Sequence, residues 1–163
     1  MLIALAITFL CAPVLYGQGA DQLMPTKKHG PFRLHVTGWD VLAWGLDGAS
    51  GILWGAHEAY QADPYVFERA GLDGDFWAHD AWLNKYRGRT VDGGMKRGLF
   101  GHTFRDVDHF TGTGSAFVFG TATVTICLQG KKGGNWKAKL AKSAVGYVVR
   151  SGAAALTYKA LRR

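Results

Sequence analysis

Three side chains in this sequence could carry out acid–base or metal chemistry together: Glu58, Asp106 and His109. Asp106 and His109 are three residues apart, so they are neighbours on the surface of a helix. A carboxylate beside an imidazole can hold the histidine tautomer for general acid–base catalysis, or both groups can bind a divalent metal ion. Glu58 would reach the pair if its helix runs antiparallel to theirs. The sequence therefore predicts these three residues as a catalytic or metal-binding cluster.

Each of the three residues also has a purely structural interpretation. Asp106 suits the N-cap of a helix, where its charge is favoured by the helix dipole. His109 suits a packed or interfacial position, and Glu58 suits a solvated helix end. The residue types alone do not decide between a catalytic or metal-binding cluster and these structural roles.

The element that must carry Glu58 is the stretch Gly38–Ala62. Its acids Asp40, Asp47 and Glu58 are seven and eleven residues apart, so they return to one face of a helix. The opposite face is apolar throughout: Val41, Leu42, Leu46, Ala49, Ile52, Leu53 and Ala56. We expect Thr37 to cap this helix and Asp63-Pro64 to end it.

Two further long helices are predicted. Residues 104–129 form the first, because residues 110–130 carry no charge and are long enough to cross a bilayer. A stripe of small residues predicts its packing face: His109, Thr113, Ala116, Gly120, Thr123 and Cys127. Residues 136–161 form the second, in which Arg150 is the only charge in mid-span and should face other helices. A short helix at the membrane interface is expected within residues 76–86.

Charged side chains in the middle of such helices need partners. A carboxylate at Asp47 is costly inside a membrane unless it is compensated, and Arg150 has the same difficulty. The simplest solution is a structural ion pair between Asp47 and Arg150, although a functional role for the pair stays open. Asp40 lies at the start of its helix, where we expect helix-end electrostatics.

The composition and the N-terminal residues also favour a membrane protein. Hydrophobic residues make up 48% of the 163 residues and charged residues only 19%, below the share usual in soluble domains. The 23 glycines suit close helix contact and the six tryptophans suit membrane interfaces. Residues 2–16 are an apolar run. We therefore expect a signal peptide or anchor helix in residues 1–20 and a single helical membrane domain in residues 21–163.

The net charge of +7 is spread over clusters that flank the apolar stretches. That distribution favours contact with lipid headgroups, whereas nucleic-acid binding would need one basic face and a recognisable motif. No glycine-rich phosphate loop follows a strand, and HExxH, CxxC and nucleophile-elbow motifs are absent from the sequence. These patterns exclude no enzyme class by themselves, but none of them prescribes a reaction.

Three motifs occur in a recognisable order: Gly51-x-x-x-Gly55-x-x-Glu58, Trp82-x-Asn84-Lys85-Tyr86 and Asp106-x-x-His109. Together they resemble a family of small, uncharacterised bacterial and phage-associated membrane proteins, over about residues 38–128. Ala81 stands where the family has serine, and Val107 stands where it has a small residue. The resemblance implies Glu58, Asn84, Lys85, Asp106 and His109 as site residues and the bacterial cell envelope as location. It implies no substrate.

The sequence thus predicts an all-α fold, a membrane-embedded bundle of three long helices plus the N-terminal signal or anchor helix. We expect a structural or interaction component of the membrane that contacts lipid, with a protein partner or a second copy of the chain as further contacts, and no nucleic acid. The alternative is a membrane-interface enzyme, such as a metal-dependent hydrolase acting on a lipid or another anionic amphiphile. In it Glu58, Asp106 and His109 would be catalytic or hold a divalent metal, while Asn84, Lys85 and Arg150 would bind substrate.

Overall fold

The computed structural model describes residues 34–95 and 104–163, and within these ranges the chain is helical. Three long helices make up most of it: α2 (Gly38–Ala62), α5 (Val107–Leu128) and α6 (Trp136–Leu161). A short helix α3 (Val66–Arg69) follows α2. The all-α class and the three long helices are therefore confirmed. The expected signal or anchor helix in residues 1–20 lies outside the described residues.

The ends of the long helices follow from local side-chain chemistry. Thr37 caps α2 through a reciprocal capping box with Asp40, and Asp63 ends the helix just before Pro64. Asn135 caps α6, because its side chain accepts a hydrogen bond from the backbone N–H of Ala138 at 3.1 Å. The predicted bounds of α2 and α6 are confirmed. Helix α5 begins three residues later than predicted, because Asp106 caps it.

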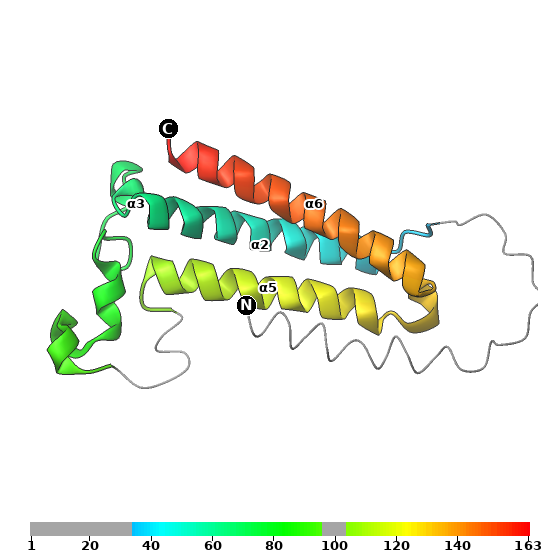
Figure 1. Ribbon diagram of the computed structural model, residues 1–163, viewed down its shortest axis with the longest axis horizontal. Helices are drawn as coiled ribbons and strands as arrows, with labels where there is room; N and C mark the ends of the chain where they lie inside the picture. The colour runs from blue at the N-terminus through cyan, green and yellow to red at the C-terminus, as the bar shows by residue number, and fades with distance from the viewer. Residues whose placement is uncertain (1–33, 96–103) are drawn as a thin grey trace, which may run out of the picture.

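Helix α2 lies between the other two helices and packs along both, whereas α5 and α6 touch each other little (Figure 1). Gln129, which follows α5, donates a hydrogen bond to Asp40 at the start of α2, at 2.8 Å, so these two helices are antiparallel. Helix α6 runs parallel to α2, since Lys142 near its start also contacts Asp40. A 3₁₀ turn, η5 (Gly130–Gly133), joins α5 to α6.

Glycines set the close contact between α2 and α6. A Cβ atom at Gly51 would overlap the carbonyl oxygen of Arg150, and one at Gly55 would overlap that of Ala154. On α6, a Cβ at Gly146 would overlap the carboxylate of Asp47. Only residues without a Cβ allow the two backbones to approach this closely.

The packing face of α5 differs from the predicted stripe. Thr113 and Ala116 are exposed, whereas Ser115, Ala122 and Ile126 are buried against α2. Small residues occur all round this helix, so composition does not mark one face. The hydrogen bonds of Ser115 with Ser50 on α2 select the face that turns inward.

Residues 63–95 cover the end of the bundle where α2 stops and α5 begins (Figure 1). The expected helix in residues 76–86 is a shorter 3₁₀ segment, η2 (Ala81–Lys85), followed by η3 (Arg87–Arg89) and η4 (Val91–Gly93). A small apolar core holds this region on the bundle: Ala59, Tyr60, Val66, Phe67, Ala81 and Val107. It thereby fixes the backbone that leads into Asp106.

Candidate functional site

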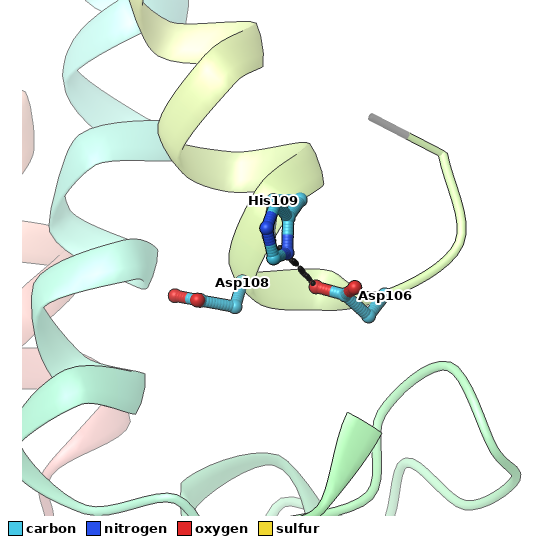
Figure 2. A group of neighbouring side chains, drawn as sticks. All are labelled: Asp106, Asp108 and His109. Carbon is cyan, nitrogen blue, oxygen red and sulfur yellow. Dashed lines mark hydrogen bonds and ion pairs between the residues drawn. The ribbon is translucent and has the colours of Figure 1, made fainter. Parts of the chain in front are cut away.

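Asp106 and His109 meet at the first turn of α5, as their spacing predicts. Oδ1 of Asp106 accepts hydrogen bonds from the backbone N–H and from Nδ1 of His109, both at 2.8 Å (Figure 2). The carboxylate is fully buried, and it is the N-cap of the helix, so the capping interpretation is confirmed as well. The contact between Oδ1 and Nδ1 holds the imidazole of His109 in one orientation.

Asp108 adds a second carboxylate to this turn, and it reaches toward α2 (Figure 2). Its Oδ1 accepts a hydrogen bond from Nε2 of Gln61 at 2.6 Å and lies 3.0 Å from Nδ1 of His57. The imidazole of His57 fits against α5 because residue 112 is a glycine, where a Cβ would come within 3.2 Å of the ring. Asp108 therefore links the start of α5 to the last turns of α2.

Asp106, Asp108 and His109 form a group of three potential metal ligands. One ligand atom from each lies within 4.8 Å of the other two. Asp108 and His57 are absent from the sequence-based cluster. A signal for Asp108 existed, because it recurs at intervals of seven with Ser115 and Ala122, both of which are buried.

Glu58 does not join this group. It is exposed and lines an open groove of about 490 Å³ between α2 and α6, whose walls include Trp54, Ala154, Ala155 and Tyr158. The acidic face of α2 is turned toward α6, whereas α5 meets α2 through Ser50, His57 and Gln61. Helices α2 and α5 are antiparallel, as expected, but Glu58 lies on another side of α2.

Asn84 and Lys85 have partners of their own in the covering segment. The Nδ2 group of Asn84 donates hydrogen bonds to the carbonyl oxygens of Asp75, at 2.6 Å, and Arg105, at 3.1 Å. It thereby ties this segment to the residues that precede α5. The Nζ atom of Lys85 lies over the rings of Trp82 and Tyr86, at 5.7 and 5.3 Å. Their roles in substrate binding stay predictions.

Arg150 faces the bundle interior as predicted, but it is not paired with Asp47. Its Nε donates a hydrogen bond to Oγ of Ser50 at 3.0 Å, and its guanidinium lies 4.6 Å from the ring centre of Phe119. Asp47 is 3% exposed and packs against Gly146, one turn earlier on α6. Among the described residues, no ion pair or side-chain hydrogen bond joins the two. The hydroxyl groups of Ser50 and Ser115, and not the carboxylate of Asp47, are the hydrogen-bond acceptors of Arg150.

The ion pair of the interior is instead Asp40 with Lys142. Oδ2 of Asp40 lies 2.7 Å from Nζ of Lys142, and both side chains are almost completely buried. Gln129 donates to the other carboxylate oxygen, and Lys142 donates to the carbonyl of Gly133 at 3.1 Å. Asp40 therefore does more than complete the capping box with Thr37. The sequence offered a signal for Lys142, which shares a face with Gly146 and Arg150 at intervals of four.

Comparison of the chain with models of protein families, with curated proteins and with solved structures found no match. The resemblance to the bacterial membrane-protein family accordingly stays a prediction that rests on the three motifs. What the site can do must be argued from its own geometry. A carboxylate-held imidazole beside a second carboxylate can transfer protons or bind a cation.

Proposed function

We propose that this chain is an integral membrane protein whose three long helices lie in the bilayer as a bundle, and that it acts as a structural or interaction component there. The observation that carries the proposal is the distribution of polarity. The bundle interior contains charged and hydroxyl side chains: Asp40, Asp47, Ser50, Thr111, Ser115 and Lys142. Large apolar side chains point outward instead, among them Ile52 at 54% exposure, Phe117 at 75% and Leu156 at 71%.

That arrangement is unfavourable in water and favourable in lipid. Apolar surface left in water costs roughly 25 cal/mol per Å², and soluble monomers rarely leave it exposed over whole helix faces. In a bilayer the outward side chains meet acyl chains, while polar groups must find partners inside the protein. The Asp40–Lys142 pair and the Ser50–Ser115 hydrogen bonds are such internal partners.

Helix α5 supports the same conclusion. Of the described helices, it alone is long and apolar enough to span a membrane by length and composition. Only 28% of its most apolar stretch is buried within the protein, whereas the core helix of a soluble protein would be mostly buried. Helices α2 and α6 have lower mean hydropathy because they contain more charged residues, of which Asp40, Asp47 and Lys142 are buried inside the bundle.

The contacts between helices favour a structural role. Ser50, Ser115 and Arg150 come from three different helices and bond to one another, which fixes the depth of each helix relative to the others. Glycines at 51 and 55 allow the backbones of α2 and α6 to touch. The enzyme alternative stays a prediction, because two residues it would use lie apart from the Asp106–His109 pair. Asn84 bonds to the carbonyl oxygen of Asp75, and Glu58 lines the groove between α2 and α6.

Membrane insertion is tested by alkaline carbonate extraction of membranes from cells that express the full chain. We expect the protein to stay in the pellet and to need detergent for release, because its outward helix faces are apolar. Recovery of the protein in the carbonate supernatant would contradict the proposal.

A thiol-reactivity experiment tests the orientation of the helix faces. In a chain with Cys11 and Cys127 replaced by serine, Phe117→Cys should not react with a charged maleimide supplied to both sides of the membrane. The matched control is Asp92→Cys, an exposed position in the covering segment, which should react. Equal labelling of the two positions in intact membranes would show that α5 faces water.

A further inference from the structure

We propose that Asp106, Asp108 and His109 bind one divalent transition-metal ion at the end of the bundle, next to His57, which contacts Asp108. The inference goes beyond the proposed membrane role and does not depend on it, because the ligands lie at the first turn of α5. Two carboxylates and an imidazole already converge there, with one ligand atom from each within 4.8 Å of the others.

Asp106 supplies an independent reason to expect a cation. Its side chain is fully buried, and while Oδ1 accepts two hydrogen bonds, Oδ2 accepts none from the described residues. A buried carboxylate oxygen without a donor loses its hydration without compensation. Coordination to a metal ion would supply the missing positive charge.

His57 repeats the pattern on the other side of Asp108. Its Nδ1 is buried and lies 3.0 Å from Oδ1 of Asp108, yet no hydrogen bond of good geometry satisfies it. In the described part of the chain, three buried side-chain atoms have no hydrogen-bond partner, and two of them are Oδ2 of Asp106 and Nδ1 of His57. Both atoms lie at the first turn of α5 or against it. Because buried polar groups are normally hydrogen-bonded, two such atoms in one place call for an explanation.

The distances fit a metal ion after a movement of the side chains. Bonds from Zn²⁺ to imidazole nitrogen or carboxylate oxygen are about 2.0–2.2 Å long, so two ligands of a tetrahedral ion are roughly 3.3–3.6 Å apart. The ligand atoms lie within 4.8 Å of one another, so side-chain rotation has to bring the most distant of them roughly 1 Å closer. Coordination by both Asp106 and His109 would replace their hydrogen bond, because a metal-bound nitrogen carries no proton to donate. The oxygen and imidazole donors suit Zn²⁺ or Mn²⁺ better than a thiolate-seeking ion.

The test uses the full chain in detergent micelles, stripped with a chelator and titrated separately with Zn²⁺ and Mn²⁺ in a calorimeter. We expect one ion bound per chain for at least one of the two metals. Asp106→Asn and Asp108→Asn should each weaken binding at least tenfold, since each removes a charged ligand. Asparagine is as good an N-cap as aspartate, so Asp106→Asn keeps the start of α5 intact. Circular dichroism verifies that each variant is folded.

The matched control is Asp92→Asn, which removes an exposed carboxylate of the covering segment outside the cluster. It should bind the ion as the unmodified chain does. Absence of binding to either metal by the unmodified chain would overturn the proposal, as would equal affinities of Asp108→Asn and Asp92→Asn. If Asp106→Asn does not fold, Asp108→Asn alone decides, because residue 108 is not the cap. Carbonate extraction reports on the membrane proposal separately.

Discussion

The contact of Gly51 with α6 gives the sharpest test of the bundle. In Gly51→Ala the new methyl group would overlap the carbonyl oxygen of Arg150 and come within 2.9 Å of the Cβ of Ala153. Carbon atoms in contact prefer about 3.5–4.0 Å. The obstructing atoms belong to backbone and to a Cβ, which cannot rotate away, so α6 must withdraw from α2 by about 1 Å.

Two costs follow from that withdrawal. Overpacking of a close contact costs about 1–3 kcal/mol. The movement also stretches the hydrogen bond from Arg150 to Ser50, now 3.0 Å long, and each hydrogen bond contributes about 1 kcal/mol. Against this, alanine favours a helix over glycine by roughly 1 kcal/mol. We therefore expect Gly51→Ala to lower the free energy of unfolding.

Gly45 on the same helix is the matched control, because a Cβ there would meet nothing within 4 Å. Gly45→Ala gains the helix preference without the collision, so the helix term cancels when the two variants are compared. The remaining difference in the free energy of unfolding should be about 1–3 kcal/mol. It can be measured by unfolding in mixed micelles with increasing sodium dodecyl sulfate, followed by circular dichroism. Equal stability of the two variants would refute the close packing of α2 on α6.

Two further predictions test the charges. Lys142→Met should destabilise the protein by about 3–5 kcal/mol, because it leaves Asp40 buried without its cation; adding Asp40→Asn should recover part of the loss in the same unfolding assay, and no recovery would count against the ion pair. In the covering segment, hydrogen bonds from the backbone N–H and Nδ1 of His79 hold the pKa of Glu68 below its ordinary value. Their contribution to stability is therefore present above the unfolded-state pKa of Glu68 and is lost as the pH falls through the folded-state value. In a nuclear magnetic resonance titration, His79→Ala should raise the pKa of Glu68 part of the way back, and an unchanged value would mean that the imidazole contributes nothing.

The helices and two of their faces could be predicted from sequence because local chemistry determines them. Thr37 with Asp40 starts α2, Asp63 with the following proline ends it, and both signals act within a few residues. The inward faces of α2 and α6 were also predictable. A charge or a glycine that recurs at helical intervals in an apolar helix marks the side turned toward the other helices, as Asp47 and Arg150 do.

The sequence did not predict which helix each face packs against, because this depends on contacts among all three helices. The acids of α2 meet α6, so Glu58 lies in the groove beside α6 and not next to Asp106. On α5, glycine, alanine, serine and threonine occur on every side, and the choice of the Ser115 face depends on a hydrogen bond to Ser50. Contacts of this kind join residues 65 positions apart in the chain, and periodicity carries no information about them.

The two ends of the bundle differ in a way that separates structure from function. At the end where α2 begins, Asp40, Lys142 and Gln129 satisfy one another, and no buried side-chain atom among them lacks a partner. At the opposite end, Oδ2 of Asp106 has no hydrogen-bond partner among the described residues, and Nδ1 of His57 lies 3.0 Å from Oδ1 of Asp108 without a hydrogen bond of good geometry. A polar network that serves only to hold helices together gains nothing from unpaired atoms, since each one costs stability. The proposed metal ion would compensate the buried carboxylate of Asp106, so the turn that carries Asp106, Asp108 and His109 is where the chemistry of this protein should be sought.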